Sequence, residues 1–317
     1  MTMHRVVVTG ASGMLGRATL RELARREDVC ALALYRRKPP GAFGKNTENR
    51  IVALDQHDQL HRLLQEFRPT AFIHAAATGM QHPYPDGSTL MRINVELPAL
   101  LAKAASDIPD CHFIHIGSGL AYRDQGRPLC EDDPLETLHP YGASKVEAEK
   151  RLRLLAQDRH ILLTIVRPFS FTGQGDFGTR LFPSLLQSAI ERRSFEMSAG
   201  DQVRDHSSVN DIARGVIAAA LQPLDNTTPI RIFNLGTGDT RPLREMVCSV
   251  IDELGLDIDL RLGSRPYSSH EPMFTVADST RAREQLEWNP QESVAHAVWE
   301  LARTSFPSLD LNEPTLR

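Results

Sequence analysis

Hydrophobic and polar positions follow two different spacings along the first half of the chain. Short apolar or β-branched runs are typical of buried strands, and they fall at Arg5–Thr9, Ala31–Leu34, Ile51–Leu54, Ala71–Ala76, Phe113–Ile116 and Leu162–Val166. Between these runs, apolar residues recur three and four positions apart, as on the buried face of a helix. The segments with this spacing are Gly13–Arg26, Gln59–Phe67, Leu90–Ala105 and Tyr141–Ala156. Such alternation of strands and helices predicts an α/β protein with a doubly wound parallel sheet.

The alternation loosens after Val166 and returns only in pieces near Ile212–Leu221 and Ile230–Leu235. Ser198–Ser208 is mostly polar, while Leu262–Pro272 contains two prolines, a glycine and no periodicity. We interpret both stretches as loops that build a site. The second half of the chain is therefore expected to be a smaller, mixed and less regular domain.

Composition and charge exclude several classes of protein. With 317 residues, of which 41% are hydrophobic, the chain can bury a large core. Its net charge of -4 gives no strong field for nucleic acid or an anionic membrane, so we expect neither as a partner. The longest apolar stretches, such as Ala71–Ala77, are far shorter than the roughly 20 residues that a membrane-spanning helix needs. No apolar signal segment precedes the strand-like Val6-Val7-Val8, which predicts a cytoplasmic protein.

The sequence gives no sign of a metal centre. Four cysteines are scattered along the chain, at Cys30, Cys111, Cys130 and Cys248. Because they lack the spacing of zinc ligands, they are expected to be reduced thiols. His112 and His115 are three residues apart in a predicted strand, so their side chains lie on opposite faces. We therefore expect no bound metal.

A glycine-rich turn joins the first predicted strand to the first predicted helix. Gly10 permits the tight turn, Gly13 lets the backbone approach a pyrophosphate, and Gly16 lets the helix pack closely on the strand. Free amides at the start of the helix would face the phosphates. The alternative is that these glycines serve only the backbone angles of a turn. The residues expected to bind a dinucleotide here are Gly10, Ser12, Gly13, Met14, Leu15 and Gly16.

The end of the second predicted strand indicates which dinucleotide binds. An acidic residue at this place binds the ribose hydroxyl of NAD, whereas an arginine suits the 2′-phosphate of NADP. The chain has Arg36 and Arg37 here, and no carboxylate occurs between Asp28 and Glu48. This favours NADP(H), with NAD(H) as the alternative. The two arginines could also be solvated loop charges without a ligand.

Two further strand ends are expected to line the cofactor. Asp55 ends the third predicted strand, where a carboxylate can accept a hydrogen bond from the adenine amino group, and Gln56 follows it. Asp55 could equally cap the next helix. Ala75, Ala76 and Ala77 have side chains small enough for a ribose or phosphate to lie against the backbone.

Tyr141 and Lys145 are the strongest candidates for chemistry. They are four residues apart at the start of a predicted helix, so their side chains share one face. An ammonium beside a phenol is expected to lower the phenol pKa and make Tyr141 a usable acid or base. Ser118 ends the preceding strand and can donate a hydrogen bond to a developing alkoxide. The alternatives are an exposed helix pair and a turn serine bonded to the backbone.

Taken together, the Gly10-x-x-Gly13-x-x-Gly16 turn, Asp55, Ser118 and Tyr141-x-x-x-Lys145 resemble the extended short-chain dehydrogenase/reductase family, in its nucleotide-sugar epimerase, dehydratase and reductase branch. The resemblance implies a Rossmann-type sheet with Tyr141 as the proton donor. It further implies that Lys145 binds the nicotinamide ribose and lowers the Tyr141 pKa, while Ser118 orients the substrate carbonyl.

The same resemblance implies roles in the second half of the chain. Pro168 would lie near the nicotinamide, while Arg204 and Arg265 would grip the diphosphate of a nucleotide sugar. Other expected substrate-binding residues are Thr78, Ser118, Gly119, Ser170 and Glu271. Ser170 stands where many relatives have an Asn. Residues 1–170 with about 205–240 would bind NADP, and about 171–204 with 241–317 would bind substrate. A homodimer would form through a four-helix contact of Leu90–Ala105 and Tyr141–Ala156.

Two departures from the family pattern refine the expected reaction. Relatives that dehydrate a hexose have Asp-Glu after the catalytic hydroxyl residue, whereas this chain has Gly119-Leu120. Typical epimerases have an acidic residue at the position of Arg36. We therefore expect NADPH-dependent reduction of a 4-keto-6-deoxy nucleotide sugar with Tyr141 as proton donor. The alternatives are a nucleotide-sugar 4-epimerase with tightly bound NAD and a non-catalytic dinucleotide-binding regulatory protein.

Overall fold

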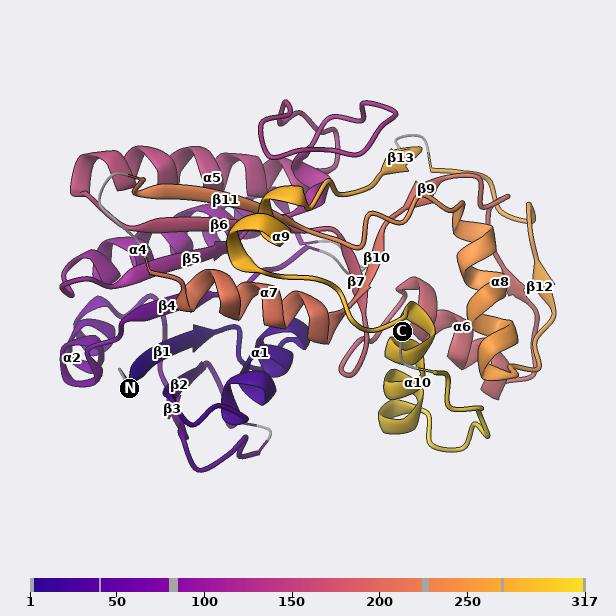
Figure 1. Ribbon diagram of the computed structural model, residues 1–317, viewed down its shortest axis with the longest axis horizontal. Helices are drawn as coiled ribbons and strands as arrows, with labels where there is room; N and C mark the ends of the chain where they lie inside the picture. The colour runs from indigo at the N-terminus through magenta and orange to yellow at the C-terminus, as the bar shows by residue number, and fades with distance from the viewer. Residues whose placement is uncertain (1–2, 40, 80–84, 224–227, 269–270, 316–317) are drawn as a thin grey trace.

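A parallel sheet of seven strands forms the centre of the molecule, in the order β11-β6-β5-β4-β1-β2-β3 (Figure 1). The computed structural model describes residues 3–39, 41–79, 85–223, 228–268 and 271–315. The strands of this sheet are β1 (His4–Thr9), β2 (Val29–Tyr35), β3 (Thr47–Ile51), β4 (Ala71–His74), β5 (His112–Ile116), β6 (Leu163–Pro168) and β11 (Ile230–Leu235). The strand order reverses between β1 and β4, the place where doubly wound sheets bind ligands. The predicted Rossmann-type sheet is confirmed.

Helices cover both faces of the sheet. One face packs against α1 (Met14–Ala24), α7 (Val209–Leu221) and α9 (Thr280–Leu286). The other packs against α2 (His57–Phe67), α4 (Leu97–Ser106) and α5 (Pro140–Arg159). Within β1, Val6 and Val8 belong to the first core and Val7 to the second, so an unbroken apolar run is buried on both sides. Among the described residues, no helix is both long and apolar enough to cross a membrane.

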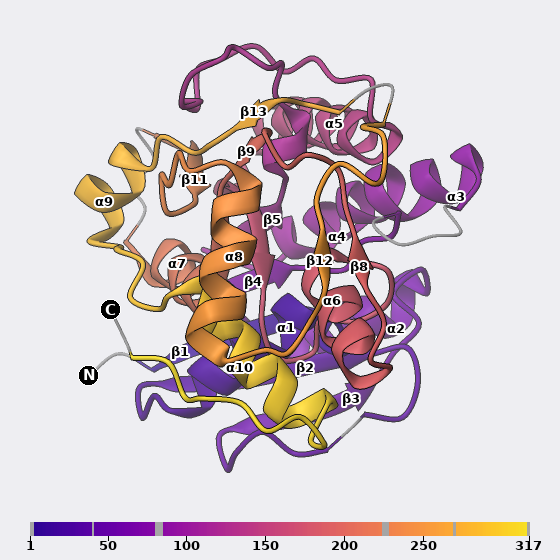
Figure 2. The same ribbon diagram turned by 90° about the vertical axis from the view of Figure 1, so that its right-hand side faces the viewer.

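A second group of elements lies beside the carboxyl ends of the strands and has its own core. Its helices are α6 (Leu181–Ile190), α8 (Leu243–Leu254) and α10 (Val294–Ser305), which face the viewer in Figure 2. Short parallel pairs accompany them: β7 (Ser170–Thr172) with β10 (His206–Ser208), β8 (Phe195–Glu196) with β12 (Leu260–Arg261), and β9 (Val203–Arg204) with β13 (Phe274–Thr275). Apolar side chains of α6, α8 and α10 form one buried cluster. This agrees with the smaller, mixed domain that the sequence predicts.

Several predicted boundaries were wrong. The third strand is Thr47–Ile51 instead of Ile51–Leu54, because the true strand lies at the sheet edge with mostly polar residues. The segment Ser198–Ser208, predicted as a loop, contains β9 and β10. The predicted helix Leu90–Ala105 spans α3 (Gly87–Met91), a π-helical turn and α4. The described part of Leu262–Pro272 has no helix and no strand, as predicted, and residues 269 and 270 lie outside the described chain.

Candidate active site

Two cavities lie next to each other at the carboxyl edge of the sheet. The first, which we call the catalytic cavity, has a volume of about 590 Å³ and contains Ser118, Tyr141 and Lys145 in its wall. The second, which we call the adenine cavity after the group that Asp55 is predicted to contact, has about 610 Å³ and is lined by Arg36 and Asp55. The residues shared by both walls are Gly13, Ala75, Ala77 and Thr78. Because they share these residues, the two cavities adjoin, and we call the pair the groove.

The glycine turn at this groove has the backbone that a diphosphate requires. Gly10 has a φ of +67°, and a Cβ there would lie 2.5 Å from the amide nitrogen of Ala76. A Cβ on Gly16 would lie 2.1 Å from the carbonyl oxygen of Gly10. Gly13 is the N-cap of α1 and offers no side-chain cap to the helix amides. These amides therefore remain suited to phosphate oxygens, and the turn fits a dinucleotide.

The adenine cavity brings together most of the residues expected there. Arg36, Asp55 and the small residues Ala75–Ala77 line it, and Arg36 is exposed. Arg37 and Gln56 are exposed but do not belong to its wall. Asp55 follows β3 in a turn, and Gln56 is the residue that precedes α2, so the alternative role of Asp55 as a helix cap is wrong.

Tyr141 and Lys145 share one face of α5 as predicted, and Lys145 lies almost fully buried beneath the tyrosine ring. The Lys145 Nζ is 5.6 Å from the ring centroid of Tyr141 and donates a 2.8 Å hydrogen bond to the carbonyl oxygen of Ile116. Ile116 ends β5, so the strand end fixes the ammonium beside the phenol. Pro140 starts the helix, which places Tyr141 in its first turn.

Ser118 has one of the two roles that its sequence position allows. Its Oγ accepts a 3.1 Å hydrogen bond from the amide of Leu120 and caps the short 3₁₀ helix Gly119–Ala121. The alternative of a backbone-bonded turn serine therefore holds. Because Oγ accepts in this bond, its own hydrogen stays able to donate into the catalytic cavity, which Ser118 also lines.

Burial dominates the charge states of the pair. It raises the pKa of the Tyr141 phenol to about 12, opposed by the positive charge of Arg180. It lowers the pKa of Lys145 to about 8, opposed by the carboxylate of Glu149. The sequence predicted a lowered Tyr141 pKa, whereas in the structure the net shift is upward, because loss of water around the phenol outweighs the attraction of Arg180.

The expected substrate residues divide into two groups. Thr78, Ser118, Gly119 and Ser170 line the catalytic cavity, as does Pro168, which was expected to contact the cofactor. Arg204, Arg265 and Glu271 lie outside its wall. The Arg204 Nη2 donates to Glu271 Oε1 at 2.6 Å, and the Arg265 Nε is 3.7 Å from Glu196. The roles of Arg204 and Arg265 in gripping a diphosphate, and of Glu271 in binding substrate, stay predictions.

Two features of the site escaped the sequence analysis. Arg180, the N-cap of α6, lines the catalytic cavity together with Phe177. Beneath the site, Arg167 and Glu149 form a buried ion pair at 2.6 Å with side chains 1% exposed. A charged residue near the carboxyl end of the largely apolar strand β6 was the available signal for this pair, since such a residue needs a buried partner.

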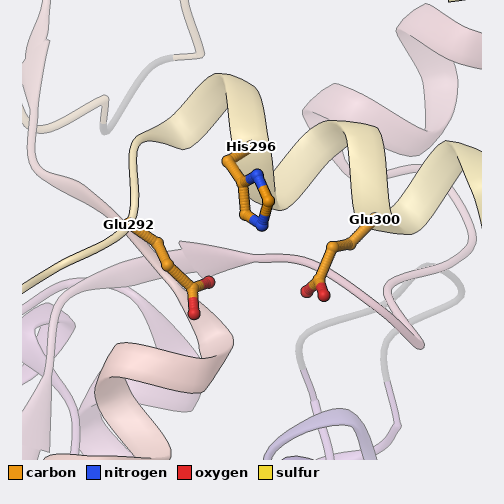
Figure 3. A group of neighbouring side chains, drawn as sticks. All are labelled: Glu292, His296 and Glu300. Carbon is orange, nitrogen blue, oxygen red and sulfur yellow. The ribbon is translucent and has the colours of Figure 1, made fainter. Parts of the chain in front are cut away.

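Three side chains that could hold a metal ion lie apart from both cavities. Glu292, His296 and Glu300 have ligand atoms within 4.8 Å of one another, and Figure 3 shows their side chains on the same side of α10. The Nδ2 of Asn210 donates to both carboxylates, and Arg214 Nη1 is 3.2 Å from Glu292. Because Arg214 already places positive charge beside this group, we interpret it as a contact between α7 and α10.

Comparison with known proteins adds relatives that match along nearly the whole chain. A UDP-glucose 4-epimerase of Lactobacillus helveticus is 28% identical over 316 residues, covering 90% of this chain and 92% of that protein. A dTDP-6-deoxy-L-talose 4-dehydrogenase (NAD(P)(+)) of Kitasatospora kifunensis is 26% identical and covers 94% of each chain.

Solved structures show the same fold at lower identity. MoeE5 in complex with UDP-glucuronic acid and NAD superimposes with a TM-score of 0.83 at 23% identity, covering 96% of this chain and 100% of that one. The UDP-glucuronic acid 4-epimerase from Bacillus cereus, in complex with UDP-glucuronic acid and NAD, gives 0.83 at 21% identity with the same coverage. A model of the NAD dependent epimerase/dehydratase family matches residues 6–236. The resemblance found in the sequence is confirmed, and the chain belongs to the NAD-dependent epimerase/dehydratase family.

Proposed function

We propose that the chain epimerises a nucleotide sugar at carbon 4 of its hexose, using a bound nicotinamide dinucleotide. The observation that carries this proposal is that Ser118, Tyr141 and Lys145 line a cavity that residues of the glycine turn also line. Relatives named UDP-glucose 4-epimerase, matched over 90% of this chain in one case, support epimerisation. This reverses the order expected from the sequence, in which reduction of a 4-keto sugar came first.

Each residue of the site has a defined task in this reaction. A nicotinamide dinucleotide, which the glycine turn and Pro168 would hold, would supply the hydride acceptor and donor for carbon 4 of the sugar. Tyr141 Oη takes the proton of the 4-hydroxyl group and later gives it back. Ser118 donates a hydrogen bond to the same oxygen. The positive charges of Lys145 and Arg180 favour the phenolate that the first half needs, and burial favours the phenol that the second half needs.

Dehydration across carbons 5 and 6 has no acid or base at the two positions that follow Ser118. Gly119 and Leu120 occupy the positions after Ser118 and line the catalytic cavity, and neither side chain can transfer a proton. The loss of water that dehydratases catalyse requires such a group next to the sugar. We infer that the substrate keeps its oxygen atoms.

NADPH-dependent reduction of a 4-keto-6-deoxy nucleotide sugar is the second candidate function. Arg36 favours it, because this exposed guanidinium lines the adenine cavity where the 2′-phosphate of NADP would lie. The Kitasatospora relative, whose name includes NAD(P)(+), gives further support. Both candidates use the same three catalytic residues.

The second candidate makes a prediction about cofactor choice. Replacing Arg36 by Ala removes a charge-assisted hydrogen bond to a phosphate, so affinity for NADPH should fall by about tenfold or more while affinity for NADH stays near its original value. Fluorescence titration with both cofactors measures this. Arg37→Ala is the matched control, since Arg37 is exposed outside the cavity wall. Unchanged NADPH affinity in Arg36→Ala would remove the support for this candidate.

We expect turnover to depend on pH through Lys145. Because burial lowers the Lys145 pKa to about 8, the ammonium loses its proton as the pH rises through that value, and turnover should fall. The unfolded chain, with the ordinary lysine pKa of 10.5, then binds more protons than the folded one between these values. The contribution of Lys145 to stability therefore rises from about pH 8 to pH 10.5.

A pH–rate profile and urea unfolding of the wild type measure the two effects. In Lys145→Arg the guanidinium stays charged over this range, so any residual turnover should lose the alkaline decline. A wild-type profile that is flat between about pH 7 and 10 would contradict the assigned role of Lys145.

The reaction itself is tested by incubating the purified protein with UDP-glucose and no added cofactor. Formation of the 4-epimer, followed by NMR, supports the proposal. A requirement for added NADPH and a 4-keto-6-deoxy substrate supports the second candidate. Binding of a dinucleotide without turnover of any nucleotide sugar in a panel would indicate the non-catalytic regulatory protein.

The proposal also covers the division of the chain into two ligand-binding regions and a dimer contact. We propose that residues 1–170 with about 205–240 bind the dinucleotide, and that about 171–204 with 241–317 bind the nucleotide of the substrate through Arg204 and Arg265. The helices α4 and α5, which pack together along one side of the sheet, are proposed to form the contact of a homodimer.

A further inference from the structure

Arg180 lies where the second group of elements meets the glycine turn. It is the N-cap of α6 and lines the catalytic cavity together with Gly13 and Met14. Its Nη1 is 4.0 Å from Met14 Sδ, and a Cβ added to Gly175 would lie 3.8 Å from Met14 Cα. Two points of the segment 173–180 thus lie against the first residue of α1, whose amides face the predicted phosphate position.

The guanidinium of Arg180 is held in a fixed orientation. Nη2 donates to the carbonyl oxygen of Phe171 at 2.6 Å, and Nη1 donates to Asp176 Oδ1 at 3.0 Å. The Asp176 side chain is 3% exposed and also accepts a 2.9 Å bond from the Thr172 hydroxyl. The Arg180 side chain keeps 25% of its surface exposed. Its remaining hydrogens are therefore available to a ligand without rearrangement of the side chain.

The wall of the catalytic cavity suits an anion. Among its described lining residues, Lys145 and Arg180 carry charge, and both charges are positive. The Lys145 ammonium already donates to Ile116 and lies under the Tyr141 ring. Arg180 is then the cation left for an anionic group near Met14. A dinucleotide diphosphate carries two negative charges, while the glycine turn supplies only amides and the partial charge of a helix end.

We infer that Arg180 binds a phosphate oxygen of the cofactor's diphosphate and so closes the site that the glycine turn begins. The inference rests on the proposed use of a nicotinamide dinucleotide, though it does not depend on which sugar reacts. In this inference the segment 173–180 slows release of the cofactor, because it places a cation over the diphosphate. Slow release matches a reaction that takes and returns hydride on one cofactor molecule.

The test compares ligands that do and do not contain the diphosphate. ADP-ribose has it, and AMP lacks it. By calorimetry, Arg180→Met should weaken binding of ADP-ribose and of NADH by about tenfold or more, while AMP binding stays unchanged. Arg180→Lys should fall between, since an ammonium keeps the charge but loses the planar fork. Arg62→Met on α2 is the control, because Arg62 is exposed outside both cavities.

A substrate anion is the other source of negative charge, and a separate arm distinguishes it. If Arg180 binds the carboxylate of a sugar acid, Arg180→Met would lower the affinity for UDP-glucuronic acid relative to that for UDP-glucose. The affinity for ADP-ribose would then stay unchanged. That result would overturn the inference. Should loss of Arg180 leave Asp176 uncompensated and the chain unfolded, Asp176→Asn with Arg180→Met removes both charges. If this double variant folds and binds ADP-ribose with unchanged affinity, the inference about Arg180 is also overturned, whichever sugar the enzyme turns over.

Discussion

Tyr141→Phe should lower kcat by about 10² to 10⁴ fold while cofactor binding stays near the wild-type value. The change removes only Oη, the atom that exchanges a proton with the sugar oxygen. The ring stays in place above Lys145, whose Nζ is 5.6 Å from its centroid, and against His139, whose ring is 6.4 Å away. Steady-state kinetics at saturating sugar and titration with dinucleotide separate these two effects.

Tyr122→Phe is the matched control for this result. Its hydroxyl group is buried outside the catalytic cavity, where it donates to Asn234 at 2.7 Å and accepts from Arg167 at 2.6 Å. Its loss should reduce stability and leave kcat near the wild-type value. Near-normal turnover of Tyr141→Phe would rule out the role assigned to Tyr141.

Arg167→Met should lower the free energy of unfolding by about 3 to 5 kcal/mol. Arg167 is 1% exposed and donates through Nε and Nη2 to both carboxylate oxygens of Glu149. Its Nη1 also donates to Tyr122 Oη and to the carbonyl oxygen of Glu131. Removing the guanidinium leaves the Glu149 carboxylate buried without its ion-pair partner, although Lys145, one helical turn away, still attracts it. Urea unfolding followed by circular dichroism measures the loss.

A double variant shows whether the unpaired charge causes this loss. Glu149→Leu with Arg167→Met removes both charges at a similar volume, so it should be more stable than Arg167→Met alone. A loss of less than about 1 kcal/mol in Arg167→Met would be the behaviour of an exposed pair and would contradict this account.

The parts of the site that the sequence predicted correctly have local signals. Three glycines at fixed spacing after a valine strand identify a turn whose geometry depends on their lack of a Cβ, and the structure bears this out at Gly10 and Gly16. Tyr141 and Lys145 share a helix face because they are four residues apart. In each case the spacing along the chain determines which atoms meet.

Features that depend on distant contacts were missed. β3 is an edge strand with several exposed positions. Its sequence is mostly polar, so it lacks the run of apolar residues by which the other strands were predicted. Arg180 reaches the cavity because a loop folds back on α1, 166 residues away in sequence from Met14. The Tyr141 pKa was predicted in the wrong direction because spacing shows the neighbouring charge but not the loss of water.

A deuterium label at carbon 4 of UDP-glucose tests the proposed function most directly. The purified protein is incubated with the labelled sugar and no added cofactor, and the products are followed by NMR. If the hydride from carbon 4 is transferred and returned without exchange with water, the 4-epimer forms and keeps the deuterium at carbon 4. No deuterium should then appear in the solvent. Loss of the label to water, or failure to form the 4-epimer from a protein that retains its dinucleotide, would contradict the account.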